Sequence, residues 1–299
     1  MTEEKRKKIR LSTIAQKKKR GEKITMLTAY DFSLARLLDR AGVEMLLVGD
    51  SAAMVVHGHP NTLPITVETM LDHTAAVCRG RQWAFVTADL PFMSYHISHE
   101  QAIENSGRFI KEAGAEAVKL EGGLEMVERV RAITKIGIPV MAHIGLSYQR
   151  IHEQSGAKVQ GRRETDRVYL LESALALQEA GAFSIILELI QEDRAAEITE
   201  RLAIPTIGIG SGAVCDGQVL VTNDLLGLYD EMTPKFVRRY AKLGEEIIKA
   251  AQRFDADVKS GSYPSPAESF APQDPATKPA AKPKKKRTNR SRERAASVH

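Results

Sequence analysis

The sequence predicts an α/β protein of the (β/α)₈ barrel class, and three observations lead to this prediction. The chain has 299 residues, 43% of them hydrophobic, and roughly 250 residues are typical of such a barrel. From residue 24 to about residue 270, short strand-like runs alternate with amphipathic stretches of helical period. Most of these runs are almost continuously apolar, which is typical of parallel strands covered on both faces. A doubly wound open sheet is the alternative arrangement of the same elements.

Eight segments are predicted to form strands because they are short, rich in β-branched residues and bounded by polar residues or Gly. In chain order they are residues 24–30, 44–50, 83–90, 115–122, 138–146, 183–190, 204–212 and 217–227. Eight strands that alternate with helices favour a closed barrel over an open sheet.

Helices are predicted between the strands from their apolar period and their end signals. The clearest are residues 31–42, 98–114, 166–181 and 233–258. The first three end on Gly, the residue that most often follows the last helical turn. Ser98 with Gln101 three residues later forms a capping-box pattern at the start of the second. The last helix closes the folded body.

The two ends of the chain differ in charge from the remainder. Residues 1–23 hold ten Lys and Arg against three acidic residues, and residues 278–299 hold nine against one. The formal charge of the whole chain is only +5, so the body between them is acidic. Residues 271–299 are rich in Pro and Lys, a composition that cannot form a core, and we expect disorder there. Three parts follow: a basic N-terminal segment or helix (1–23), a catalytic barrel (24–270) and a tail (271–299).

Several classes of protein are disfavoured by composition. No apolar run approaches the roughly 18 residues of a membrane span, and the N-terminus lacks the apolar core of a secretory signal. Cys78 and Cys215 offer neither a disulfide framework nor a metal-binding pair. We therefore expect reduced thiols and a cytoplasmic protein. The basic run at 282–287 could neutralise phosphates, but it lacks interleaved aromatic residues, so nucleic-acid binding is the less favoured alternative.

Polar side chains recur where the predicted strands end, which a turn alone does not explain. In a closed barrel these ends meet at one mouth, where barrel enzymes hold their sites. Lys119 and Glu121 stand two residues apart and so face the same side of their strand. The full set, from the second strand to the seventh, is Asp50, Asp89, Lys119, Glu121, His143, Glu188 and Ser211.

Three of these residues predict a metal site. Asp50, Asp89 and Glu121 would bring three carboxylates together, which is costly unless a cation or proton neutralises them. Oxygen ligands without Cys suit a hard ion, most often Mg²⁺, although zinc or cobalt remains compatible with the pattern. Mg²⁺ keeps open coordination positions, and a bidentate α-keto acid would fit them.

The remaining residues predict proton abstraction next to a carbonyl group. Glu188 stands among apolar neighbours in the sequence "IILELI", a setting that raises the pKa of a carboxyl group and suits a base near neutral pH. Lys119 can stabilise the negative charge that develops on an enolate.

Two long connections and one Gly-rich turn add to the predicted mouth. Residues 51–66 and 147–166 follow the second and fifth strands, and connections of that length are often functional. The sequence "GIGSG" at 208–212 follows the seventh strand. It predicts either a phosphate site, common at this place in a barrel, or a tight turn that lets the backbone approach a ligand.

Taken together, these residues resemble the ketopantoate hydroxymethyltransferase family. The matching blocks extend through Leu11–Phe270 and include "TAYD" (28–31), "LLVGDS" (46–51), "ADLPFMSY" (88–95), "VKLEGG" (118–123), "HIGL" (143–146), "KVQGR" (158–162) and "DGQVLV" (216–221). The sequence "SYQRIHEQSGA" (147–157) departs from the aromatic, Gly-rich family pattern, and residues after about Phe270 are an addition.

The resemblance implies an activity and a set of roles. Mg²⁺ would be held through Asp50, Asp89 and Glu121. The keto acid would contact Asp50, Ser51, Asp89 and Lys119, and Glu188 would accept the proton. The one-carbon donor would be 5,10-methylenetetrahydrofolate, the products 2-dehydropantoate and tetrahydrofolate, and the assembly a large homo-oligomer, typically a decamer. Neither substrate requires a phosphate site at 208–212.

One rival interpretation keeps the same barrel. Relatives of phosphoenolpyruvate mutase and isocitrate lyase also place Mg²⁺-binding carboxylates at strand ends. They would be expected to carry a Cys-bearing loop, whereas the long loops here contain no Cys.

Overall fold

The computed structural model describes residues 6–154, 156–229 and 234–270. The chain divides into two compact units, Met1–Glu246 and Ile247–His299. Neither Cys78 nor Cys215 forms a disulfide. Of the helices in the described parts, none combines the length and apolar character needed to cross a membrane.

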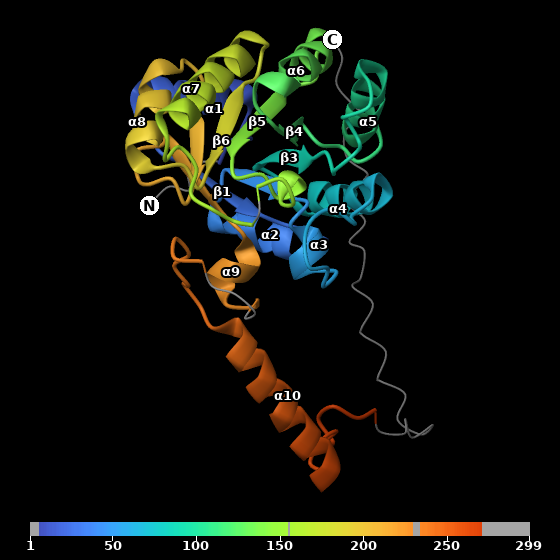
Figure 1. Cartoon of the computed structure of the whole chain (residues 1–299). Helices are drawn as coiled ribbons and strands as arrows, with labels where there is room; N and C mark the ends of the chain where they lie inside the picture. The colour runs from blue at the N-terminus through green and yellow to red at the C-terminus, as the bar shows by residue number, and fades with distance from the viewer. Residues whose placement is uncertain (1–5, 155, 230–233, 271–299) are drawn as a thin grey trace, which may run out of the picture. The chain divides into compact units, whose positions relative to one another are not determined.

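The first unit is a closed barrel of eight parallel strands (Figure 1). Each strand pairs with the next in the chain, and the last pairs with the first through Ile24 opposite Gly217. This closure confirms the predicted barrel and excludes the open sheet. The strands are β1 Ile24–Thr28, β2 Met45–Val48, β3 Phe85–Asp89, β4 Ala117–Glu121, β5 Val140–Gly145, β6 Ser184–Glu188, β7 Thr206–Ile209 and β8 Gly217–Leu220.

Helices cover the outside of the strands, as α4, α5, α6 and α7 show in Figure 1. Short 3₁₀ turns lie at Leu124–Met126 and Tyr148–Arg150. The helices are α1 Leu11–Arg20, α2 Phe32–Ala41, α3 Ala52–Val55, α4 Val67–Gly80, α5 His99–Lys111, α6 Val127–Lys135, α7 Glu164–Glu179, α8 Glu192–Arg201, α9 Thr222–Leu226 and α10 Leu243–Ser260.

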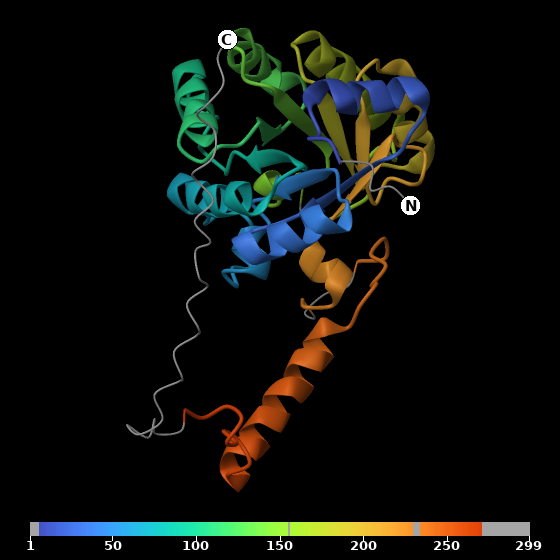
Figure 2. The ribbon, with the colours of Figure 1, turned by 180° about the vertical axis from the view of Figure 1, so that it is seen from behind.

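A small apolar cluster fills one end of the barrel interior. It contains Met26, Met45, Phe85 and Met141, and α1 contributes Ile14 to it. In the view from behind, α1 is the dark blue helix in front of the strands (Figure 2). Since this end is packed, a ligand site has room only at the other end.

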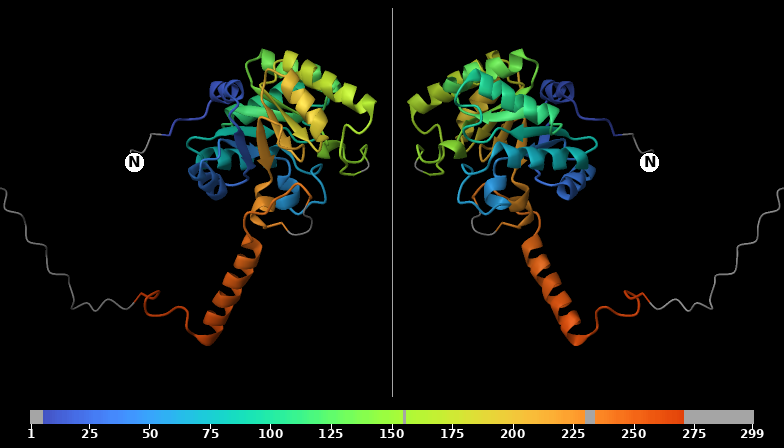
Figure 3. Two further views of the ribbon diagram at one scale, coloured as in Figure 1. Left: turned by 90° about the vertical axis from the view of Figure 1, so that its left-hand side faces the viewer. Right: turned by 90° about the vertical axis from the view of Figure 1, so that its right-hand side faces the viewer.

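The opposite end of the barrel carries the loops that follow the strands. In the side views, the light blue segment after β2, the yellow-green loop after β5 and the orange α9 gather on the side away from α1 (Figure 3). The C-terminal ends of the strands face these loops, as in other barrels of this class.

Two predicted elements are wrong in their extent. The eighth strand stops at Leu220 instead of residue 227, because Thr222 turns to bond Thr28 through its backbone N–H and its hydroxyl, and α9 begins there. The final helix starts at Leu243 instead of residue 233. Before it, the Tyr240 N–H donates to the Leu225 carbonyl at 2.8 Å, a tertiary bond that replaces a helical one.

The predicted tail, residues 271–299, lies outside the described residues. Its Pro- and Lys-rich composition predicts that it contributes nothing to the catalytic core. Truncation after Phe270 should therefore leave kcat and KM unchanged within experimental error. Steady-state assays of the truncated and full chains test this, and a large loss of activity or of assembly would show that the tail has a structural role.

Candidate active site

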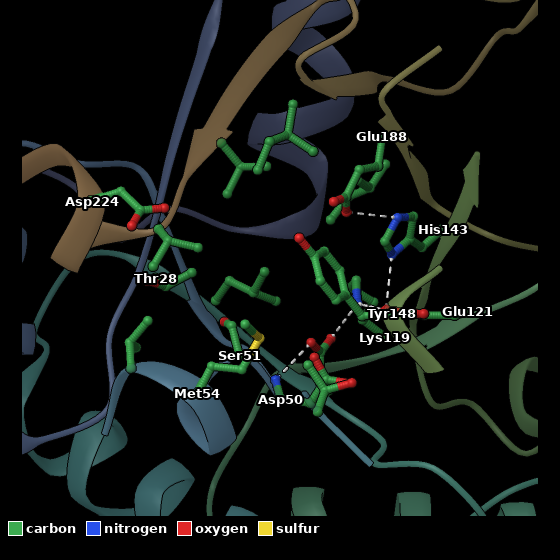
Figure 4. Close-up of a pocket in the computed structure, with 18 of the residues that line it drawn as sticks. Thr28, Asp50, Ser51, Met54, Lys119, Glu121, His143, Tyr148, Glu188 and Asp224 are labelled. Carbon is green, nitrogen blue, oxygen red and sulfur yellow. Dashed lines mark hydrogen bonds and ion pairs between the residues drawn. The ribbon is translucent and has the colours of Figure 1, made fainter. Parts of the chain in front are cut away.

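Seven of the sequence-predicted residues line one cavity of about 110 Å³ at the mouth of the barrel (Figure 4). They come from five consecutive strands, β2 to β6, or from the residues just after them. Ser211 is buried at the end of β7 but does not line the cavity. The residues brought together are Asp50, Ser51, Asp89, Lys119, Glu121, His143 and Glu188.

Asp50 and Asp89 form the acidic end of this cavity. Both carboxylates are buried, and the Asp50 backbone N–H donates to Asp89 Oδ2 at 3.0 Å. Burial, followed by the charges of Glu121 and Asp89, raises the pKa of Asp50 to about 8. Burial also raises the pKa of Asp89, although Lys119 opposes it. Ionising both carboxylates at once is therefore costly unless a proton or a cation balances their charge.

Lys119 supplies part of that positive charge. Its Nζ lies 2.8 Å from Asp89 Oδ1 and 3.5 Å from Glu121 Oε1. Burial opposes protonation of this amine, but Asp89, Glu121 and Asp50 outweigh it and raise its pKa. Lys119 is thus a cation held between two carboxylates. In the described part of the chain, no three or more His, Cys, Asp or Glu side chains form a ready-made metal centre.

His143 stands between two glutamates. Its Nδ1 lies 3.3 Å from Glu121 Oε1, and its Nε2 lies 3.2 Å from Glu188 Oε2. Burial and the Lys119 charge disfavour the protonated ring, but the two carboxylates outweigh them and raise the pKa of His143 to about 9. Glu121 in turn has a lowered pKa, because His143 and Lys119 outweigh the effect of its burial.

The environment of Glu188 differs from the one predicted. Its apolar neighbours Ile185 and Leu187 pack into the layer between strands and helices, whereas its own carboxylate points into the cavity toward His143 (Figure 4). Alternation along a strand sends successive side chains to opposite faces. Of the apolar residues on β6, Ile186 is the one that shares the cavity with Glu188, so the apolar run describes its surroundings only in part.

A bent backbone fixes the position of Glu188. Leu189 has a φ of 48°, an uncommon left-handed conformation for a non-Gly residue. Ser211 holds this bend from β7, because its hydroxyl donates to the Leu187 carbonyl at 2.8 Å and accepts from the Ile190 N–H at 3.0 Å. Gly145 allows the close approach of β5, since a Cβ there would lie 2.2 Å from the Glu188 carbonyl oxygen.

Replacing Ser211 by Ala should therefore weaken both stability and catalysis. The Ile190 N–H loses its acceptor, which costs roughly 1–3 kcal/mol for a buried group left unsatisfied, and the bend beside Glu188 loosens. Denaturant unfolding measures the first effect, and kcat measures the second. Ser211→Thr keeps a hydroxyl and should recover part of both. Equal stability in the wild type and Ser211→Ala would contradict this role.

The loop after β5 provides residues that the sequence did not single out. Ser147 donates to Glu121 Oε2 at 2.5 Å. Gln149 donates from Nε2 to Asp50 Oδ2 at 2.9 Å and accepts from the Tyr95 hydroxyl at 2.6 Å. The Tyr148 ring enters the cavity (Figure 4). Its burial, followed by the charges of Glu188 and Asp224, raises the pKa of its hydroxyl to about 12.

The turn at 208–212 is packed against the protein itself. A Cβ on Gly210 would lie 2.9 Å from the Phe236 ring, and one on Gly212 would lie 2.6 Å from the Glu192 side chain. A carboxylate at this turn would repel a phosphate. The geometry therefore favours the tight turn among the two interpretations of this sequence.

Comparison with known proteins resolves the choice between the family and its rival. The family model described as "Ketopantoate hydroxymethyltransferase" matches residues 8–266. A protein of Syntrophus aciditrophicus named 3-methyl-2-oxobutanoate hydroxymethyltransferase is 54% identical over 90% of this chain and 99% of its own length. One of the same name from Geobacter sulfurreducens is 51% identical, over 86% of this chain and 97% of its own length.

Solved structures share the fold at much lower identity. A phosphonopyruvate hydrolase crystallised with oxalate and Mg²⁺ superposes with a TM-score of 0.57 at 13% identity, covering 86% of this chain and 92% of its own. A 2,3-dimethylmalate lyase of the phosphoenolpyruvate mutase/isocitrate lyase superfamily gives a TM-score of 0.53 at 15% identity, covering 86% and 92%. This likeness concerns the barrel alone. By its sequence match and by the residues at the mouth of its barrel, the chain belongs to the ketopantoate hydroxymethyltransferase family and is a hydroxymethyltransferase.

Proposed function

We propose that this enzyme transfers the one-carbon unit of 5,10-methylenetetrahydrofolate to 3-methyl-2-oxobutanoate, in pantothenate biosynthesis. Water supplies the hydroxyl oxygen, and the products are 2-dehydropantoate and tetrahydrofolate. The observation that carries the proposal is the continuous line of charges that runs from the buried Asp89 through Lys119, Glu121 and His143 to the partly exposed Glu188. Such a line can bind an anion at one end and move a proton at the other.

Asp50 and Asp89 fit a hard cation such as Mg²⁺. The two carboxylates are buried side by side with Lys119 Nζ 2.8 Å from Asp89 Oδ1, and the pKa of Asp50 is raised by its burial and by the carboxylates beside it. Proteins usually hold Mg²⁺ through one or two carboxylates, with water and substrate oxygens in the other positions. When bound, the ion would polarise the keto oxygen of the substrate.

The role of Glu121 in metal binding differs from that of the two aspartates. Its Oε2 already accepts from Ser147 and from the Gln149 backbone N–H, and its Oε1 faces Lys119 and His143. We therefore propose that Asp50 and Asp89 hold the cation directly. Glu121 would support the bound cation from the next layer, while it keeps Lys119 and His143 in place.

The other residues orient the keto acid and take its proton. Lys119 lies beside the acidic end, where it stabilises the oxygen that becomes negative as the enolate forms. The Ser51 hydroxyl, 2.9 Å from the Tyr30 hydroxyl, offers the substrate a hydrogen bond from the same end. Glu188 accepts the proton from C3, and the protonated His143 beside it stabilises the carboxylate until it does so.

A direct assay tests the proposal. The purified chain is incubated with 3-methyl-2-oxobutanoate and 5,10-methylenetetrahydrofolate, with Mg²⁺ or with a chelator, and 2-dehydropantoate is followed by NMR. We expect product only when both substrates and a divalent ion are present. Turnover that is equally fast in the chelated sample would remove the metal from the proposal, and no product at all would refute the reaction.

The assembly and the compartment belong to the same proposal. We expect a cytoplasmic homo-oligomer, a decamer by analogy with the family. Light scattering coupled to size-exclusion chromatography measures the assembly, and a monomer that is fully active would contradict it.

A further inference from the structure

Asp224 is an acidic residue on the side of the cavity away from the predicted base. It lies in the first turn of α9 and lines the same cavity as Glu188. Figure 4 shows it across the cavity from Glu188 and His143. It is half-buried, and its burial raises the pKa of the carboxyl group despite the charge of Arg239. The reaction chemistry described above does not use it.

The Asp224 carboxylate is an unused acceptor. Among the described residues, none donates a hydrogen bond to its side chain or forms an ion pair with it. Backbone groups of α9 near it have partners of their own. The Gly227 N–H donates to the Asp224 backbone carbonyl, and the Thr222 N–H donates to the Thr28 hydroxyl. A carboxylate that faces the cavity without a donor from the described residues is available to a ligand that presents donors.

The cavity wall near Asp224 is largely apolar and suits a flat ring. Its apolar side chains come from α3, β7, β8 and the segments after β8, and a planar heterocycle binds best in such a slot with a few polar groups at its ends. The wall residues concerned are Val55, Ile209, Val219, Val221 and Phe236.

The second cavity, of about 430 Å³, lies beside the loop after β5 and offers a ligand fewer unpaired charged groups. Its charged residues already have partners within the protein. Arg150 contacts Glu125 at 2.5 Å and Glu153 at 2.6 Å, and Arg163 contacts Asp166 at 2.8 Å. The cavity at the barrel mouth is therefore the better place for a ligand that presents hydrogen-bond donors.

We propose that Asp224 binds the pyrimidine edge of the reduced pteridine in the one-carbon donor. This inference rests on the proposed function and assigns the position of its second substrate. A 2-amino-4-oxopyrimidine ring carries two parallel donors, N3–H and the exocyclic amine, and a carboxylate accepts both at once, as it does from Arg. N5 lies at the far side of the bicyclic ring from this edge. Anchoring at Asp224 thus directs the one-carbon unit across the cavity toward Glu188 and the bound keto acid.

The experiment compares Asp224→Asn with Asp72→Asn, which makes the same change at an exposed position on α4. The amide that replaces the Asp224 carboxylate presents its own N–H groups to the ring, so one acceptor becomes a donor. In Asp224→Asn we expect KM for 5,10-methylenetetrahydrofolate to rise roughly 10- to 100-fold. KM for the keto acid and the rate of C3 proton exchange without folate should stay at the wild-type values. Asp72→Asn should match the wild type in all three.

A binding measurement separates this inference from the proposed function. Calorimetry with 5-formyltetrahydrofolate, a stable folate with the same pyrimidine edge, needs no turnover. Weaker binding by the same factor in both Asp224→Asn and Asp224→Ala supports the inference even if the transfer reaction is refuted. Wild-type affinity in these variants would overturn it. Loss of C3 exchange in Asp224→Asn would also overturn it, because Asp224 would then serve the keto acid.

Discussion

Replacing Glu188 by Gln should slow exchange of the C3 proton of 3-methyl-2-oxobutanoate with solvent by a factor of about 10² to 10⁴. That range is typical of a positioned general base. Gln has nearly the same shape but cannot accept the proton. The measurement needs no folate: the keto acid is incubated with the enzyme and Mg²⁺ in deuterated water, and loss of the C3 signal is followed by NMR.

The structure gives reasons to expect a selective effect. Keto-acid binding should be largely retained in Glu188→Gln, because Ser51 follows β2, Lys119 lies on β4, and both are unchanged. The bend at Leu189 and its support by Ser211 involve backbone groups that the substitution leaves intact. The loss should therefore appear in the rate of exchange and not in the affinity for substrate.

A matched control is Glu104→Gln on the exposed side of α5, which should exchange the proton at the wild-type rate. If Glu188→Gln also exchanged it at that rate, the base would lie elsewhere. His143 would be the next candidate, since its Nε2 lies 3.2 Å from Glu188 Oε2 and the residue lines the same cavity.

The fold could be predicted because parallel strands leave a strong local signal. Most of the strands are buried on both faces, so each of these is a short apolar run that can be recognised without knowledge of its partners. The eighth strand shows the limit of this reasoning. Residues 217–227 have the pattern of one long strand, but Thr222 bonds to Thr28 at the end of the adjacent β1 and the strand ends early. A contact between residues 194 positions apart in the sequence has no local signature.

The site could be predicted in part for a similar reason. Asp50, Asp89, Lys119 and Glu121 interrupt apolar runs, and closure of the barrel is enough to bring them together. Gln149 and Ser147 were missed because they lie in a polar loop, where a Gln or Ser carries no signal of its own. Only the folded loop shows that Gln149 reaches both Asp50 and Tyr95.

Glu188 was predicted as a site residue from its apolar neighbours in the sequence, and that reasoning was incomplete. Its apolar neighbours marked the residue as unusual, but Ile185 and Leu187 face the other side of β6. The apolar run does not reveal that His143 on the adjacent strand places its Nε2 3.2 Å from the Glu188 carboxylate. Cross-strand neighbours depend on register, which the sequence of one strand does not specify.

Replacing Asp89 by Asn should abolish turnover while the fold survives. The variant removes one of two carboxylates proposed to hold the cation. Loss of a residue that only supports a metal ligand typically lowers metal affinity roughly 10- to 100-fold. Asp89 is a proposed direct ligand, so we expect a larger fall in Mg²⁺ affinity. Without the cation, the keto oxygen loses its main electrostatic support, and a loss on the order of 10³-fold in kcat is expected. Calorimetry with Mg²⁺ and steady-state assays measure the two effects.

The fold should tolerate Asp89→Asn because the substitution removes one ion pair but also removes a buried charge. The amide oxygen of the new side chain can still accept the Asp50 N–H, which now bonds Asp89 Oδ2 at 3.0 Å. Lys119 loses its closest partner but keeps Glu121, 3.5 Å away. Burial already disfavours the charged form of Asp89, so a neutral group avoids that cost. Circular dichroism and thermal unfolding serve as controls for the fold, and Asp72→Asn serves as the control for the substitution. Wild-type Mg²⁺ affinity in a folded Asp89→Asn protein would place the cation away from Asp89, and the two-aspartate site would have to be abandoned.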